Sequence, residues 1–147
     1  MIMRQIKFRG KQLNGEWAYG DLLRIGGGCI IYIGSKTETQ TPYIHKDSNV
    51  AVELFDNDIA IVIPDTLGQF TGLTDCHGKE IYEGDILVYG GLYKHVVEFK
   101  HGMFGYTLLD GWFIGYGGNS NFSFNPLDKS KEHEVIGNIH DNSELLK

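Results

Sequence analysis

The sequence predicts an all-β protein built from short strands, and three observations support that prediction. Glycine is abundant, with 20 residues among 147, whereas proline occurs only 3 times. The chain also contains 8 Tyr, 8 Phe and 2 Trp, and aromatic residues favour strands. No segment sustains the 3.6-residue apolar period of an amphipathic helix. Short apolar runs separated by turn residues are typical of a small barrel or sandwich.

The first expected elements form a hairpin near the N-terminus. Ile6 and Phe8 alternate with polar residues, as on a half-buried strand. The Asn14–Gly15 pair is a strong hairpin signal because both residues tolerate positive φ. A second turn at Gly26–Gly28 leads into CIIYIG at 29–34. Its β-branched residues favour a third strand.

The middle of the chain alternates between polar and apolar segments. The stretch from Ser35 to Asn49 is polar and contains a proline, so we expect a loop or an edge region. The segment 50–64 regains alternation, with a turn at Asp56–Asn57. Pro64 should end that strand because proline cannot donate to a ladder. We therefore expect an N-terminal β-unit over residues 1–64.

The remainder, residues 65–147, is expected to form a second β-unit. The segment 80–109 predicts three strands separated by glycine turns. The segment 111–130 is rich in glycine, asparagine and aromatic residues, which predicts a long loop. A last strand is expected over 133–142, followed by a tail or one helical turn.

An internal similarity relates the two units. The segments from Phe8 to Leu23 and from Phe70 to Leu87 share a set of residues in the same order, which indicates an internal repeat. The matched pairs are Phe8/Phe70, Gly10/Gly72, Gly15/Gly78, Tyr19/Tyr82, Gly20/Gly84, Asp21/Asp85, Leu22/Ile86 and Leu23/Leu87. Two related β-units, one in each half, are the simplest interpretation.

The shared Gly-Asp step bears on whether Glu80, Glu83 and Asp85 form a chemical cluster. Glu80 and Glu83 have no acidic counterpart in the first copy, whereas the Gly-Asp-aliphatic-aliphatic pattern persists. Gly adopts backbone shapes closed to other residues, and Asp accepts bonds from nearby backbone N–H groups. We therefore predict a structural turn motif at Gly20–Asp21 and at Gly84–Asp85.

Three stretches of the chain resemble the YopX family of phage and prophage proteins. They are IKFRGKQLNGEWAYGDLL, PDTLGQFTGLTDCHGKEIYEGDIL and EVIGNIHDNSELL, and they follow in order across most of the chain. The resemblance implies a mainly β protein whose C-terminal half is similar to an SH3-like barrel. It also implies an origin in a phage or an integrated prophage. It implies no activity, and it supplies no catalytic residues.

The composition of the chain bears on which partners it can bind and on where in the cell it is expected to lie. The formal net charge of −6 argues against a non-specific grip on nucleic acid, which needs a positive field. Cys29 and Cys76 form no zinc or redox spacing, as expected of thiols in a reducing cytoplasm. We find no signal-peptide pattern and no apolar run near the roughly 20 residues that span a membrane. A cytoplasmic location is expected.

The sequence contains no convincing catalytic or metal-binding constellation. Cys76 and His77 are adjacent, whereas zinc ligands and Cys–His catalytic pairs rarely arise from adjacency. The histidines are expected to be solvated turn residues: His45, His77, His95, His101, His133 and His140. We therefore expect no enzyme activity, no metal and no cofactor.

Two groups of residues are candidate binding sites. Trp112, Phe113 and Tyr116 stand in the glycine-rich segment, where exposed aromatics serve as anchors; alternatively they plug the end of a small barrel. Lys7, Arg9 and Lys11 alternate along a strand, so they could form a basic stripe on one side. Alternatively, they are the charges that protect a solvated edge strand from aggregation.

We therefore expect a non-enzymatic binding or assembly module that acts through protein–protein contacts. The partner is expected to be another copy of the chain, or an unidentified phage or host protein. The alternative is a nucleic-acid-associated accessory protein that uses the basic stripe at residues 7–11 together with nearby aromatics. No association with a membrane is expected.

Overall fold

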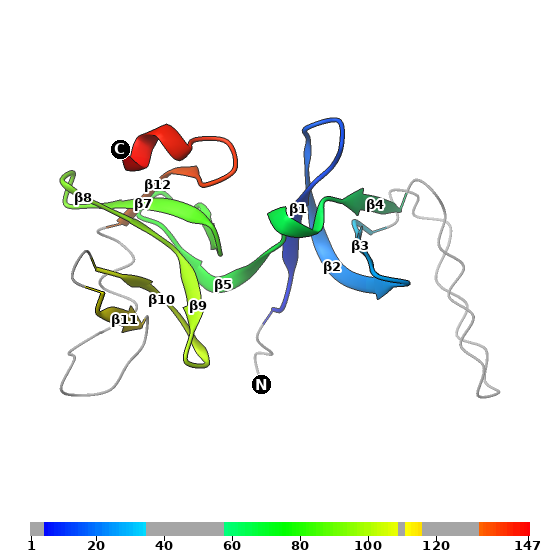
Figure 1. Cartoon of the computed structure of the whole chain (residues 1–147), viewed down its shortest axis with the longest axis horizontal. Coiled ribbons are helices and arrows are strands. Elements are labelled where there is room, and N and C mark those ends of the chain that lie inside the picture. Colours follow the sequence, from blue (N-terminus) through cyan, green and yellow to red (C-terminus); the bar gives the residue numbers. More distant parts are fainter. Residues whose placement is uncertain (1–4, 35–57, 109–110, 116–132) are drawn as a thin grey trace. The chain divides into compact units, whose positions relative to one another are not determined.

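A computed structural model describes residues 5–34, 58–108, 111–115 and 133–147 (Figure 1). The prediction of an all-β protein is confirmed, since the regular elements of the described residues are short strands and 3-10 turns. The chain forms two compact units, the N-terminal unit of residues 7–67 and the C-terminal unit of residues 1–6 with 68–147. The expected loop from Ser35 to Asn49 and the expected turn at Asp56–Asn57 lie outside the described residues.

The N-terminal unit is an antiparallel sheet with the strand order β4-β3-β2-β1. Its elements are β1 (Phe8–Lys11), β2 (Trp17–Ile25), β3 (Gly28–Tyr32), β4 (Ile59–Val62) and the 3-10 turn η1 (Pro64–Thr66). The predicted hairpin turn is present, because the N–H of Gln12 donates to the carbonyl of Glu16 at 2.8 Å and Gly15 has φ +89°. The sheet therefore follows the local turn chemistry of the sequence.

The sheet curls so that the end of β4 meets the end of β1. Val62 forms an isolated antiparallel bridge with Gln12, and the N–H of Ile63 donates to the carbonyl of Lys11 at 2.8 Å. The N–H of Lys11 in turn donates to Oγ1 of Thr66 at 2.8 Å. These hydrogen bonds provide partners for backbone groups at the step from β4 to η1, because buried backbone N–H and C=O groups need such partners.

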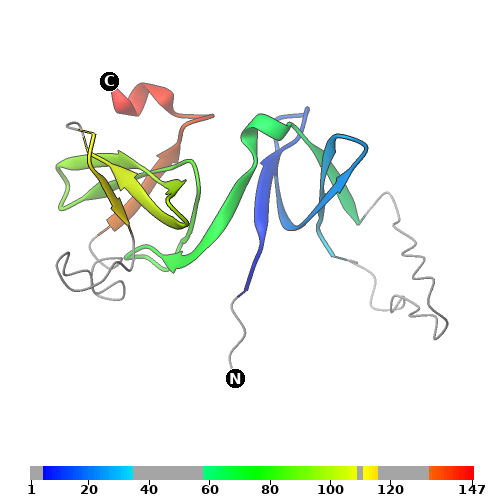
Figure 2. The same ribbon diagram turned by 60° about the horizontal axis from the view of Figure 1, so that its bottom comes forward.

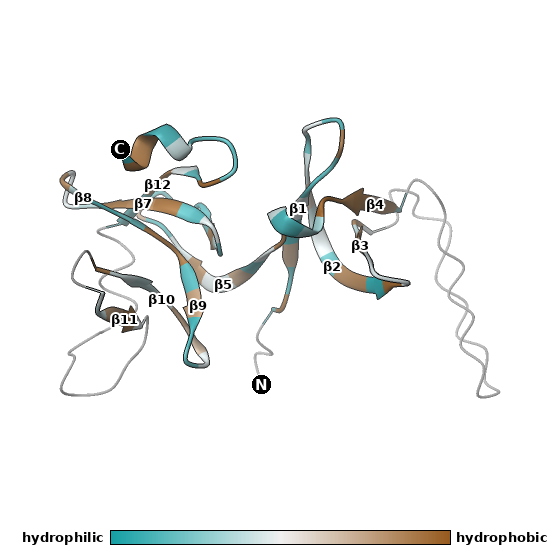
Figure 3. Cartoon of the chain, viewed as in Figure 1, coloured by the Kyte–Doolittle hydropathy of each residue, from teal (hydrophilic) through white to brown (hydrophobic). Residues whose placement is uncertain are grey.

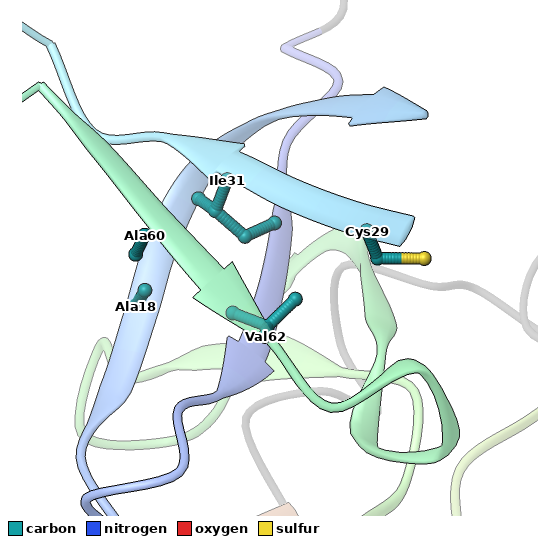
Figure 4. Packing of buried hydrophobic residues seen from close by; sticks show 5 residues of the cluster. All are labelled: Ala18, Cys29, Ile31, Ala60 and Val62. Atoms are coloured by element: carbon teal, nitrogen blue, oxygen red, sulfur yellow. The ribbon is translucent and has the colours of Figure 1, made fainter. Parts of the chain in front are cut away.

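The core of the N-terminal unit lies inside this curl (Figure 4). It consists of alternate residues of β2, β3 and β4: Ala18, Cys29, Ile31, Ala60 and Val62. Phe8, Leu22 and Leu67 pack against this cluster. Gly10 is required at the closure, because a Cβ there would lie 2.7 Å from the Cβ of Val62. The alternation predicted for half-buried strands is therefore present in all three strands.

Gly20 and Asp21 lie inside β2, where the internal similarity predicted a tight turn. Gly20 pairs with Phe8 and Asp21 pairs with Tyr32. A Cβ at Gly20 would collide with the backbone carbonyl oxygen of Tyr32, so the close approach of β2 and β3 explains this glycine. Gly84 has φ +84° and does lie in a turn. The Gly-Asp pair thus occurs in both similar segments, but it lies within a strand in the first and in a turn in the second.

The C-terminal unit contains a hairpin and two three-stranded antiparallel sheets (Figure 2). The hairpin joins β5 (Gly68–Thr74) to β6 (Glu80–Tyr82). One sheet has the strand order β12-β7-β8, and its strands are β7 (Asp85–Tyr89), β8 (Tyr93–Val96) and β12 (His133–Asn138). The other has the order β11-β10-β9 with β9 (Glu98–Lys100), β10 (Met103–Thr107) and β11 (Phe113–Gly115), and the chain ends with the 3-10 turn η3 (Ser143–Leu146).

A second core holds the C-terminal unit together. Ile81, Leu87, Val97 and Val135 are buried in one cluster, with Leu73 packed against it. These residues come from separate strands and from the Val97 junction between β8 and β9. The similarity of this half to an SH3-like barrel stays a prediction.

One sequence expectation is wrong in this unit. Residues 113–115 were expected within a long loop, but they form β11, paired with β10 in the register Gly105↔Gly115 and Thr107↔Phe113. The sequence did not predict this strand because its segment is rich in glycine, and glycine normally weakens strands. Gly105 is explained by the close approach of the neighbouring strand, since a Cβ there would collide with the carbonyl oxygen of Ile114.

Candidate binding surfaces

The acidic residues of the GKEIYEGDIL stretch have separate structural roles. Asp85 is 1% exposed, and its Oδ2 accepts a hydrogen bond from the N–H of Tyr82 at 2.8 Å. The hydroxyl of Tyr82 donates to Oε2 of Glu80 at 2.8 Å. Burial raises the pKa of Glu83, although the Gln69 backbone bond acts in the other direction. This geometry is that of a turn between β6 and β7.

Asp75 is a structural residue that sequence reasoning missed. Its Oδ1 accepts bonds from the N–H groups of His77 and Lys79 at 2.8 and 2.9 Å, and its Oδ2 accepts from the N–H of Val135 at 3.1 Å. Burial acts to raise the pKa of Asp75, but these backbone donors and the nearby His77 hold it below its ordinary value. The carboxylate therefore joins the β5–β6 turn to β12. The signal was an Asp three residues before Gly78 in a turn, which is typical of Asx turns.

The expectation of solvated histidines is wrong for His95 and His133. Both are buried, and their ring centroids lie 5.1 Å apart in an edge-to-face arrangement. His95 also stacks on Tyr106 at 4.0 Å, and His133 on Tyr89 at 4.9 Å. Burial and then the neighbouring His133 lower the pKa of His95 to about 4. His95 is therefore a neutral aromatic packing residue at neutral pH, and His133 packs beside it.

The described residues contain no cluster of three or more His, Cys, Asp and Glu side chains suited to a metal ion. Cys76 and His77 are both exposed at the β5–β6 turn. Nε2 of His77 lies 3.6 Å from Oε1 of Glu134, an exposed pair of the kind that contributes little. His45 lies outside the described residues.

The predicted basic stripe lies on one face of the N-terminal unit, but its central member is enclosed. Arg9 pairs with Tyr19 and Lys11 with Trp17 across β1 and β2, so these side chains share a face, and Lys7 directly precedes β1. Arg9 is only 6% exposed, and its Cζ lies 4.8 Å from the centroid of the Trp17 ring. Because a buried guanidinium stacked on indole cannot reach a phosphate without rearrangement, the stripe is a poor nucleic-acid surface.

The same face continues into an apolar surface, here called the outer face. It is the face of the N-terminal sheet opposite the core, and its members follow from the strand registers. Its β2, β3 and β4 members are Tyr19, Asp21, Leu23, Ile25, Ile30, Tyr32, Ile59 and Ile61. Ile61 is 68% exposed and Ile25 is 59% exposed. The hydrophobic colour of β4 is evident in Figure 3.

The outer face is arranged in cross-strand rows. Leu23 pairs with Ile30, and Ile30 pairs with Ile61. Tyr32 pairs with Ile59 in the next row. In these rows Ile61 is exposed, whereas its neighbours in the rows are half-buried. Apolar side chains that are contiguous at the surface, unlike singly scattered ones, mark interaction sites. Sequence reasoning did not find this surface, because strand register was needed to bring three strands together.

The aromatic candidates near β11 do not form one surface. Trp112 is 68% exposed. Phe113 is half-buried and covers Gly105, since a Cβ there would lie 2.7 Å from the Cζ of Phe113. Lys100 lies over the same ring, with Nζ 6.0 Å from its centroid. Tyr116 lies outside the described residues. Phe113 is therefore a packing residue of its sheet, and only Trp112 retains the exposure of a binding anchor.

The fold and these surfaces define an all-β protein of two small units with exposed apolar strands. The sequence profile of the YopX protein family matches residues 7–147. Because that match covers nearly the whole chain, the protein belongs to the YopX family.

Comparison with solved structures shows that this chain is similar to an uncharacterised bacterial protein. The crystal structure of protein EF1440 from Enterococcus faecalis is 25% identical in sequence, and the alignment covers 99% of this chain and 100% of that one with a TM-score of 0.48. No curated protein sequence matches this chain. The described part of the chain has no helix with the length and hydropathy needed to cross a membrane.

Proposed function

We propose that this protein is a non-enzymatic assembly module that acts through protein–protein contacts, with another copy of itself as the principal partner. The observation that carries this proposal is the outer face of the N-terminal unit. There, Ile25 and Ile61 expose most of their side chains beside Leu23 and Ile30. Removal of such apolar area from water favours association by roughly 25 cal/mol per Å².

The absence of an enzyme activity is part of this proposal. What supports it is the structural use of the titratable groups that the sequence singled out. Asp75 and Asp85 bind backbone N–H groups, whereas active sites gather such groups around a reacting atom. A phage or prophage setting and a cytoplasmic location also belong to the proposal, and they rest on the family resemblance and on composition.

The nucleic-acid alternative is less well supported. Its central residue would be Arg9, which is buried against Trp17, and the chain has a formal net charge of −6. Phosphate contacts need accessible cations, and they weaken steeply as salt is added.

The experiment is size-exclusion chromatography with light scattering, at low and high salt, with and without a mixed pool of short DNA and RNA. The proposal predicts a defined oligomer larger than the 16.5 kDa chain, unchanged by nucleic acid and persistent at high salt. A monomer that shifts to larger mass only with nucleic acid, and only at low salt, would contradict the proposal and support the alternative.

A further inference from the structure

The turn between β1 and β2 places an asparagine side chain beside a backbone nitrogen that can attack it. Asn14 and Gly15 are both exposed, and they form the one Asn-Gly step in the sequence. In such a step the glycine nitrogen can bond to the side-chain carbonyl carbon of the asparagine and close a five-membered ring. Glycine has no Cβ to crowd that approach, and a Cβ built at Gly15 meets no atom within 4 Å.

The carboxamide of Asn14 is held beside the peptide group that follows it. Its Oδ1 accepts a hydrogen bond from the N–H of Glu16 at 3.0 Å, which is an Asx turn. Its Nδ2 donates to Oε2 of Glu16 at 3.0 Å. Because Glu16 follows Gly15 directly, the two bonds keep the carboxamide over the Gly15 peptide group and away from open solvent.

The bond from the Glu16 N–H also suits the electrostatics of the attack. As the Gly15 nitrogen adds to the carbonyl carbon, negative charge develops on Oδ1 of Asn14. A donor that is already aimed at such an oxygen stabilises the transition state, and the N–H of Glu16 has this position. The turn therefore orients the carbonyl and polarises it through one backbone donor.

One contact of the turn opposes the reaction. The N–H of Gly15 donates to the carbonyl of Gln12 at 3.0 Å, and this bond has to open before the nitrogen loses its proton. The net strength of a hydrogen bond in an exposed turn slows the attack by roughly 2- to 12-fold. Correct placement of reacting groups has the larger effect, since a displacement of about 1 Å can cost on the order of 10²-fold.

We propose that Asn14 is a site of spontaneous deamidation in the folded protein, with the N–H of Glu16 as the positioning donor. The Gly15 nitrogen loses its proton and bonds to Cγ of Asn14. The Cγ–Nδ2 bond breaks, and the nitrogen leaves as ammonia after it takes up a proton from solvent. One water molecule then opens the ring at either carbonyl and gives aspartate or isoaspartate, with no oxidation or reduction. This modification does not depend on the proposed assembly function.

The modification changes both the charge and the backbone of the hairpin. The product carries a carboxylate where Nδ2 of Asn14 now donates to Glu16, so two negative charges repel each other. Isoaspartate also adds a methylene to the main chain of a turn that the N–H of Gln12 and the carbonyl of Glu16 close at 2.8 Å. We therefore expect the modified hairpin to open more readily.

The test is incubation of the purified chain at neutral pH, followed by tryptic digestion and mass spectrometry. The peptide of residues 12–24 contains Asn14 as its one asparagine, and the peptide of residues 132–147 contains Asn138 and Asn142 as internal controls. A parallel sample is kept unfolded in urea. Because the residues after both controls carry a Cβ, Asn14 should convert at least about tenfold faster than either in the folded protein. It should also convert at least as fast in the folded protein as in urea.

Three variants separate the chemistry from the turn. Asn14→Gln lengthens the ring that has to close, so it should show no conversion at this position. Glu16→Pro removes the backbone donor and should slow conversion at least about tenfold, whereas Glu16→Gln keeps that donor and should convert at the wild-type rate. The wild-type comparison decides the proposal even if Glu16→Pro fails to fold. Conversion of Asn14 that is slower in the folded protein than in urea, or no faster than that of Asn138 and Asn142, would overturn it.

Discussion

Replacing Asp75 with alanine should destabilise the C-terminal unit through the loss of three acceptor bonds. The N–H of Val135 is buried, and leaving it without a partner costs about 1–3 kcal/mol. The N–H groups of His77 and Lys79 are in an exposed turn and can bind water, so each lost bond there costs about 0.5–1.5 kcal/mol. The expected loss in the free energy of unfolding is therefore about 2–6 kcal/mol.

The assay is urea unfolding followed by circular dichroism at pH 7. Asp21→Ala is the matched control, because Asp21 is an exposed strand residue and its replacement should change stability by no more than about 0.5 kcal/mol. The pKa of Asp75 is lowered in the folded state, so its contribution is present above the unfolded pKa near 3.9 and is lost as the pH falls through the folded value. An Asp75→Ala effect as small as that of Asp21→Ala would refute the reasoning.

Three further predictions concern stability. The pKa of His95 is lowered to about 4, so the free energy of unfolding should fall by up to about 3 kcal/mol as the pH drops from about 6.5 to 4. His95→Phe should remove this contribution to the pH dependence of the free energy of unfolding, and an identical pH dependence in the variant would contradict its assignment to His95. Gly20→Ala should destabilise the N-terminal unit by about 1–3 kcal/mol because of its backbone collision, whereas Gly28→Ala, with 3.4 Å to its nearest neighbour, should be nearly neutral in thermal unfolding. Asp85→Ala should cost at least about 1–3 kcal/mol in urea unfolding because it leaves the N–H of Tyr82 buried without its acceptor; a change below about 0.5 kcal/mol would exclude that role.

Local signals predicted much of the fold. The Asn14–Gly15 turn lies where expected because its backbone shape is encoded by two adjacent residues. Pro64 ends the strand before it for the same local reason. Arg9 and Lys11 do share one face of β1, since alternation along a strand is also a local property.

Non-local contacts explain what could not be predicted. The contact of Arg9 with the ring of Trp17 is made across the hairpin. The role of Asp75 depends on Val135, 60 residues away. The glycine at position 20 resembles Gly84 in its neighbours, but its use is set by the carbonyl of an adjacent strand. Such environments arise from strand register, which a single sequence specifies only weakly.

The outer face follows the same rule. Ile25, Ile30 and Ile61 are unremarkable apolar residues of separate strands in the sequence. Their importance as a binding surface arises only when β2, β3 and β4 are aligned.

The most direct test of assembly through protein–protein contacts is the mass of the purified chain by light scattering over a concentration series at high salt. The account predicts a mass above the 16.5 kDa of the single chain, without nucleic acid. A mass that stays at that of the single chain across the whole series would contradict it.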